Sequence, residues 1–170
     1  MECPLATGAG WIGRARHATL LPMSAEDQAV ILTCAGCGAR NRVVIERFAS
    51  APSCGKCKRA LLQPGQPLEL DDETFAAVIA GSRRPVLVDF WADWCGPCKA
   101  FAPTLERFAK RHANDVLVAK VNVDAAQAVA GQHQVSSIPT LCLFRGGREV
   151  ARHVGGLSLH QLEELVRTAA

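Results

Sequence analysis

The fold of this chain is decided by the segment Val86-Leu87-Val88-Asp89-Phe90-Trp91-Ala92-Asp93-Trp94-Cys95-Gly96-Pro97-Cys98-Lys99. Its first five residues are almost continuously apolar, which is typical of a central strand covered on both faces. A helical pattern begins at Cys98 and runs to Arg111. A C-x-x-C pair placed between a buried strand and a helix is typical of a redox-active dithiol.

The position of the two cysteines explains this chemistry. Cys95 lies at the first turn of the expected helix, where unpaired backbone N–H groups and the positive end of the helix dipole favour a thiolate over a thiol. Cys98 lies one turn further on and can attack a mixed disulfide formed at Cys95. The alternatives are a structural pair or one half of a metal site. We expect the redox pair.

Asp89 is a carboxylate in the middle of the apolar strand. Burying a carboxylate is costly unless it has a partner or a task. The alternative is that Asp89 ends the strand and faces solvent. The Phe-Trp sequence that follows it favours burial.

Outside this segment, short apolar runs alternate with helical patterns. The element order is βαβαβαββα, expected at residues 68–70, 74–80, 86–90, 98–111, 116–123, 125–132, 141–144, 149–154 and 159–168. Gly146-Gly147 is a two-residue connection suited to a hairpin, so the sheet should be mixed. The apolar character of strands 86–90 and 116–123 predicts helices on both faces.

Four further cysteines form two more C-x-x-C pairs. They are Cys34 and Cys37, then, after 16 residues, Cys54 and Cys57. This spacing is typical of a structural zinc site, in which four thiolates surround one tetrahedral Zn²⁺. So short a segment has too little core to fold alone, and the ion would supply the missing stability. Two disulfides or an iron–sulfur cluster are the alternatives.

The composition limits the possible functions. The chain has 170 residues, 49% of them hydrophobic, and a net charge of +3. This size allows one domain and a small appendage, and the charge argues against a nucleic-acid partner. No apolar run is long enough to span a membrane, and the first residues do not read as a secretion signal. We therefore expect a cytoplasmic protein, in which paired cysteines serve metal binding or catalysis.

The chain divides into four segments by composition. Residues 1–27 have no periodicity and are expected to be a flexible extension, with Met23 as a possible true start and Cys3 as a free thiol. Residues 28–62 carry the zinc ribbon, and residues 63–67, with two prolines and a glycine, form a linker. Residues 68–170 make the α/β domain.

The segment from Val88 to Lys99 resembles the active-site signature of the thioredoxin family. Further matches follow in order, at residues 118–124, 137–140, 144, 147 and 154–155. The resemblance covers about residues 67–170 and implies a thioredoxin fold, with a central mixed sheet flanked by helices. It also implies a cis bond before Pro139, beside the cysteines, where the neighbouring backbone pairs with an extended substrate.

The resemblance further implies roles for single residues. Asp89 would give and take the proton of Cys98, and Lys120 would pair with Asp89. An apolar patch for binding disulfide substrates would comprise Trp94, Gly96, Pro97, Ile138, Pro139 and Gly155, with Gly156 beside it. Cys142 is expected to be a buried residue without a catalytic role.

A zinc ribbon ahead of such a domain resembles the zinc-bearing bacterial thioredoxins of the thioredoxin-2 type. This resemblance implies a monomeric protein-disulfide reductase that acts on client proteins, holds one structural Zn²⁺ and is restored by an NADPH-dependent reductase. The alternative function is a holdase or adaptor that responds to oxidation and loss of zinc. An oxidant or isomerase would need an oxidising compartment.

Overall fold

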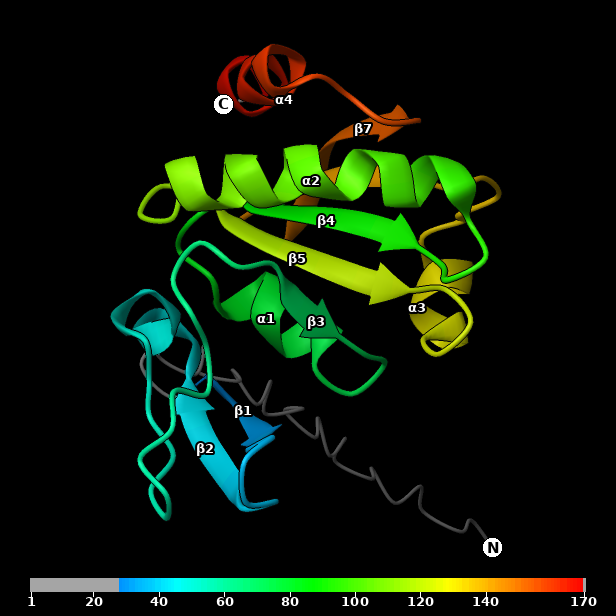
Figure 1. Cartoon of the computed structure of the whole chain (residues 1–170). Helices are drawn as coiled ribbons and strands as arrows, with labels where there is room; N and C mark the ends of the chain where they lie inside the picture. The colour runs from blue at the N-terminus through cyan, green and yellow to red at the C-terminus, as the bar shows by residue number, and fades with distance from the viewer. Residues whose placement is uncertain (1–27, 170) are drawn as a thin grey trace, which may run out of the picture.

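The structure is a computed structural model that describes residues 28–169 (Figure 1). The expectations for the extension 1–27, for Cys3 and for Met23 lie outside the described residues. None of the described helices is long and apolar enough to cross a membrane.

A five-stranded mixed sheet forms the centre of the larger part of the chain (Figure 1). Its strands, in spatial order, are β3 (Leu68–Leu70), β5 (Leu117–Asn122), β4 (Val86–Trp91), β6 (Thr140–Arg145) and β7 (Arg148–Val154). β3, β5 and β4 run parallel, whereas β6 and β7 are antiparallel to their neighbours. The predicted mixed sheet is confirmed.

Helices cover both faces of this sheet, as predicted. On one face lie α1 (Phe75–Gly81) and α3 (Gln127–Gln132), and on the other lie α2 (Gly96–Arg111) and α4 (Leu159–Thr168) (Figure 1). Side chains alternate along a strand, so β4 feeds two cores. The face toward α1 carries Val86, Val88 and Phe90, whereas Leu87 packs against α2 and α4 on the other face.

The β6–β7 connection is the predicted Gly146-Gly147 hairpin. Both glycines have positive φ, 53° and 81°. A two-residue hairpin turn with both central residues at positive φ matches the twist of the strands it joins, and glycine adopts this conformation without strain.

The N-terminal segment consists of a small hairpin and two equivalent knuckles. β1 (Ala29–Thr33) pairs antiparallel with β2 (Arg40–Val44), and the 3-10 helix η2 (Ile45–Ser50) follows. Cys34 opens the first knuckle and Cys54 the second. In each, the residue four positions after the first cysteine donates its N–H to the carbonyl of that cysteine.

The ribbon packs against α1 and shares its hydrophobic core. Buried Val30, Ile45 and Phe48 belong to the same cluster as Val78 and Ile79 of α1. The approach is close at Gly81, where a Cβ would come within 2.7 Å of the Ile45 Cδ1 atom. The 63–67 segment is therefore not the only link between the two parts.

The ribbon also contacts the chain just before β4. Glu46 lies 3.6 Å from Arg83, three residues ahead of that strand. Cys95 follows the opposite end of β4. Six residues of strand span roughly 20 Å. The ribbon contact at Arg83 and Cys95 therefore lie at opposite ends of β4, and Figure 1 shows α2 beginning beyond the far end of this strand.

Candidate functional site

A disulfide at the start of α2 forms the centre of the site. Cys95 and Cys98 are bonded, with an S–S distance of 2.01 Å, and both are buried. Cys95 is the N-cap residue of α2, and its Sγ accepts the Cys98 backbone N–H at 3.1 Å. The predicted placement of Cys95 beside unpaired N–H groups is therefore present in the structure.

The loop before β6 brings Ile138 to this disulfide. Ile138 packs against the buried cluster of Ala92, Cys95 and Cys98, and the Ile138–Pro139 bond is cis. The Pro139 carbonyl accepts the Gly155 N–H at 2.8 Å, which joins the cis-proline loop to the end of β7. Ile138 is thus placed against the cysteines, and the end of β7 is joined to the loop that carries it.

The exposed part of the predicted patch lies next to the disulfide in the sequence. Trp94 is 70% exposed, and Gly96 and Pro97 are also exposed. The Trp94 indole is not free to turn, because its Nε1 donates to the Asp124 Oδ2 atom at 2.9 Å. An exposed apolar surface beside a reactive group is typical of an interaction site.

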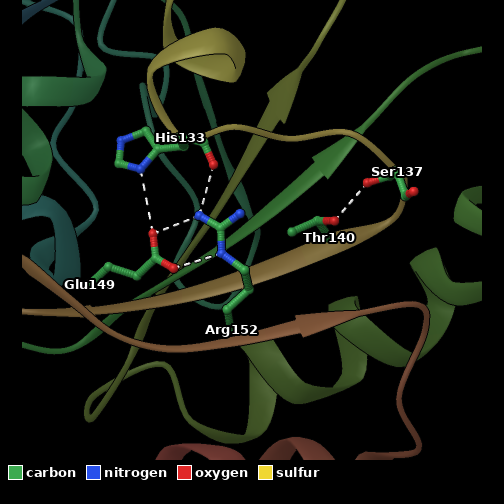
Figure 2. A network of polar contacts seen from close by, with 5 residues as sticks. All are labelled: His133, Ser137, Thr140, Glu149 and Arg152. Carbon is green, nitrogen blue, oxygen red and sulfur yellow. Dashed lines mark hydrogen bonds and ion pairs between the residues drawn. The ribbon is translucent and has the colours of Figure 1, made fainter.

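A network of charged side chains holds the segment that leads to Pro139 (Figure 2). Arg152 on β7 binds both carboxylate oxygens of Glu149, at 2.7 and 2.9 Å, and donates to the His133 carbonyl at 2.8 Å. The His133 ring lies 3.5 Å from Glu149. Further along, the Thr140 hydroxyl donates to the Ser137 carbonyl at 2.6 Å. Both ends of segment 133–140 are thereby fixed.

Asp89 lies on the α2 face of β4 and is almost completely buried, at 1% exposure. The solvent-facing alternative is therefore wrong. Its Oδ1 atom accepts no hydrogen bond from the described part of the chain. Burial raises the pKa of Asp89 to about 7, while the charge of Lys120 lowers it and that of Glu69 raises it. Asp89 can therefore hold or release a proton near neutral pH.

Lys120 lies opposite Asp89 in the β4–β5 register, but its ion pair is with another residue. Lys120 Nζ is 3.7 Å from Glu69 Oε1 and 3.7 Å from the centroid of the Trp91 ring. Among the described residues, Lys120 and Asp89 form no ion pair within 4.0 Å. The charge of Lys120 acts on Asp89 across the strands instead.

The four cysteines of the ribbon form one compact cluster. Their sulfur atoms all lie within 4.8 Å of one another, with Cys34 3.5 Å from Cys57 and Cys37 3.6 Å from Cys54. None of the four is in a disulfide. Sulfurs at the corners of a tetrahedron with Zn–S bonds near 2.3 Å are roughly 3.8 Å apart. The cluster therefore fits a closed, four-thiolate metal site.

Backbone N–H groups in both knuckles favour thiolates. The Gly36 N–H lies 3.4 Å from the Cys34 Sγ atom and lowers the pKa of Cys34. In the second knuckle the Cys57 N–H lowers the pKa of Cys54 to about 6. At Cys37 the Ala39 backbone N–H lowers the pKa, but the neighbouring cysteine sulfurs and burial outweigh it and raise the pKa to about 12. Outside the ribbon, burial raises the pKa of Cys142 to about 12.

Sequence reasoning missed three residues of this site. Glu69 pairs with Lys120, and Asp124 accepts from the Trp94 indole. Arg152 holds the segment that leads to Pro139. Asp124 ends the matched stretch 118–124, and Glu69 left a local signal, because Leu68-Glu69-Leu70 places a carboxylate on the face opposite to two leucines. The partner of that carboxylate depends on which strand lies next to it.

Comparison with known proteins gives matches over both parts of the chain. The family model for thioredoxin matches residues 66–168, and the model described as Thioredoxin 2, N-terminal, a zinc ribbon, matches residues 33–59. Thioredoxin C-3 of Corynebacterium nephridii is 44% identical over 135 residues, which is 79% of this chain and 92% of that protein.

Two other relatives match the larger part alone. The thioredoxin of Alicyclobacillus acidocaldarius is 51% identical over 96 residues, 56% of this chain and 90% of that protein. A bifunctional thioredoxin reductase/thioredoxin of Mycobacterium leprae is 50% identical over 91 residues, 54% of this chain and 20% of that protein.

The dithiol pair at a helix start, facing a cis-proline loop, defines a thiol–disulfide oxidoreductase. The chain belongs to the thioredoxin family, as a protein-disulfide reductase that carries the N-terminal zinc-ribbon domain of thioredoxin 2. The resemblance stated from the sequence is confirmed.

Proposed function

We propose that Cys95 is the nucleophile of the reduced protein and Cys98 the resolving residue. The Cys95 thiolate attacks a disulfide of a client protein, forming a mixed disulfide and releasing one client thiol. Cys98 then loses its proton and attacks the Cys95 sulfur. The second client thiol leaves, and two electrons have passed to the client. The observation that carries this assignment is the position of Cys95 as the N-cap of α2, bonded to Cys98.

Asp89 is the proposed acceptor of the Cys98 proton. A buried carboxylic group with a pKa near 7 can exchange a proton at neutral pH, which an ordinary aspartate cannot. Lys120 is assigned an electrostatic part in the same step, since its positive charge favours the ionised form of Asp89.

Trapping with a client protein tests the order of attack. We expect Cys98→Ser to accumulate a mixed disulfide between Cys95 and the client, because the resolving thiol is missing. Cys95→Ser should form none. The adducts are counted by mass spectrometry after incubation with insulin whose disulfides are intact. Equal trapping by both variants, or trapping only by Cys95→Ser, would contradict the assignment.

The apolar surface around the disulfide is the proposed client-binding site. It comprises the exposed Trp94, Gly96 and Pro97, the half-buried Ile138 and Gly155, and the buried Pro139. The exposed Trp94 indole and the contact of Ile138 with the cysteine cluster support this proposal. Binding through backbone and apolar contacts would accept many client sequences.

The Arg152 network should tune the affinity of that surface. Arg152→Lys loses the two-oxygen contact with Glu149 and the bond to the His133 carbonyl. A partly exposed pair of this kind contributes up to about 1 kcal/mol to holding the loop in place, so its loss can weaken client binding by at most roughly fivefold. We expect KM for insulin to rise by up to about fivefold, with the rate on a small aromatic disulfide unchanged.

Arg167→Lys is the matched control, because it disrupts an exposed Arg–Glu pair of the same spacing on α4. It should leave KM unchanged. The same KM for Arg152→Lys and wild type would show that the network does not position the loop.

We assign the recycling of the dithiol to an NADPH-dependent thioredoxin reductase. The match to a bifunctional thioredoxin reductase/thioredoxin supports this partner. We propose a cytoplasmic location, since a reducing thiol needs a reducing compartment. The protein is proposed to act as a monomer.

One Zn²⁺ bound by Cys34, Cys37, Cys54 and Cys57 is the proposed cofactor. Its role is structural, because four thiolates leave no open position. Metal analysis of the reduced protein with thiol counting should find one zinc and four protected thiols. We also propose three divisions of the chain after residue 27: a ribbon at 28–62, a linker at 63–67 and a thioredoxin domain at 68–170.

The shared core of the ribbon and α1 favours one second candidate, a holdase or adaptor that responds to oxidation. Expulsion of the metal would loosen Ile45 and Phe48 and uncover Val78 and Ile79. Zinc release by mild peroxide, together with suppressed aggregation of a client protein, would support this function. Retained zinc would contradict it.

A further inference from the structure

Three charged side chains form a row across the sheet beneath α2. The register pairs Glu69 of β3 with Lys120 of β5, and Lys120 with Asp89 of β4. Residues opposite each other on neighbouring strands point to the same face of a sheet. Asp89 shares the α2 face with Leu87 two residues earlier. Lys120 is therefore flanked by a carboxylate on each side.

The two carboxylates have very different surroundings. Asp89 is 1% exposed, whereas the Glu69 side chain is 65% exposed at the edge of the sheet and the Lys120 side chain is 18% exposed. An ion pair nearer solvent costs less desolvation than one in the core. Lys120 accordingly pairs with Glu69 at 3.7 Å, and its ammonium lies 3.7 Å from the Trp91 ring centroid.

We propose that Glu69 is a positioning residue of the redox site, which draws the Lys120 ammonium toward the sheet edge and away from the Asp89 carboxyl group. Glu69 raises the pKa of Asp89 in two ways. Its negative charge disfavours a second negative charge on Asp89, and its pairing with Lys120 withdraws the positive charge that would stabilise ionised Asp89. The inference rests on the proposed role of Asp89 as the proton acceptor of Cys98.

The other charged groups near this row are few. On α2, Glu106 and Lys110 line a hollow of about 270 Å³ together with Glu69 and Lys120. Partial desolvation of the carboxylate raises the pKa of Glu69, and so does the negative charge of Asp93, which follows β4, while Lys120 lowers it. β6 presents the apolar Leu141 opposite Asp89, and the start of α2 presents the disulfide. Glu69 and Lys120 are the charges that act on the pKa of Asp89.

The test is a titration of the Asp89 carboxyl by carbon NMR in the oxidised full-length chain. In Glu69→Gln, Asp89 should titrate about half a pH unit lower, the size expected for one partly screened charge at this range. In Lys120→Gln it should titrate higher. In the double variant the effect of Glu69→Gln should shrink, because the ammonium through which Glu69 acts is gone.

Glu73→Gln is the control. It removes one exposed carboxylate four residues further along the chain, and its Asp89 titration should match that of the wild type. An Asp89 titration in Glu69→Gln that equals the wild type would overturn the proposal. An equally large effect of Glu69→Gln with and without Lys120 would also overturn it, since Glu69 would then not act through Lys120.

The pH profile of insulin reduction separates this inference from the function on which it rests. A profile that moves with the Asp89 titration supports both. If the titration moves while the rate profile stays in place, the role of Asp89 in proton transfer is refuted, and the control of Asp89 by Glu69 stands.

Discussion

Replacement of Asp89 by Asn is expected to make the oxidised protein more stable at pH 8 than the wild type, by up to about 4 kcal/mol. The reason is the cost of ionising a buried carboxyl group. Burial raises the pKa of Asp89 to about 7, from an ordinary value of 3.8. Each unit of difference is worth about 1.4 kcal/mol between the folded and unfolded states.

The sign of this effect follows from proton binding. Between about pH 4 and pH 7 the unfolded chain loses the Asp89 proton while the folded protein keeps it, so stability falls as the pH rises through this window. Above about pH 7 the loss is complete. Asparagine has nearly the same shape and cannot ionise, so the advantage of Asp89→Asn should be present at pH 8 and should be lost by pH 4.

Urea unfolding of both proteins at pH 4, 6 and 8 measures the effect. Asp115→Asn, at an exposed position, provides the correction for the general effect of removing one negative charge. A stability difference between Asp89→Asn and wild type that is the same at pH 4 and pH 8 would refute the raised pKa.

Removal of the metal from the reduced protein is expected to lower the midpoint of thermal unfolding of the whole chain, not only that of the ribbon. Ile45 and Phe48 pack in one core with Val78 and Ile79. Loss of the ribbon would expose part of this surface, at a cost of about 1 to 3 kcal/mol for each fully exposed side chain. In a chain of this size we expect a fall of about 5 to 10 °C.

Calorimetry with and without a zinc chelator makes the measurement. The variant Cys54→Ser/Cys57→Ser provides the control, because it lacks two ligands and should already melt at the lower temperature without further change on chelation. If the thioredoxin part melts at the same temperature after loss of the metal, the shared core does not couple the two parts.

Much of the redox site could be predicted because its residues lie close together in the sequence. The apolar strand, Cys95 and the start of the helix follow one another, and local rules place the sulfur at the helix N-terminus. The ribbon ligands were predictable for the same reason, since their spacing is a property of the sequence alone. The resemblance to thioredoxins added the cis bond at Pro139.

The remaining features depend on contacts between distant segments. The sequence shows that Glu69 lies on one face of a short strand, but not that this strand pairs with β5 in a register opposite Lys120. For the same reason the pairing of Lys120 with Asp89, inferred from resemblance, differs from the ion pair observed. The packing of Ile45 against Gly81 also has no local signal, so the orientation of the ribbon could not be derived.

The placement of the ribbon and the disulfide at opposite ends of β4 has a kinetic consequence. Exchange between sulfurs requires them to touch. Oxidising equivalents held by Cys95 and Cys98 therefore cannot reach the four metal-binding thiols of the same molecule. Damage to the metal centre by this route needs a collision of two copies, so its rate should grow with the square of the protein concentration.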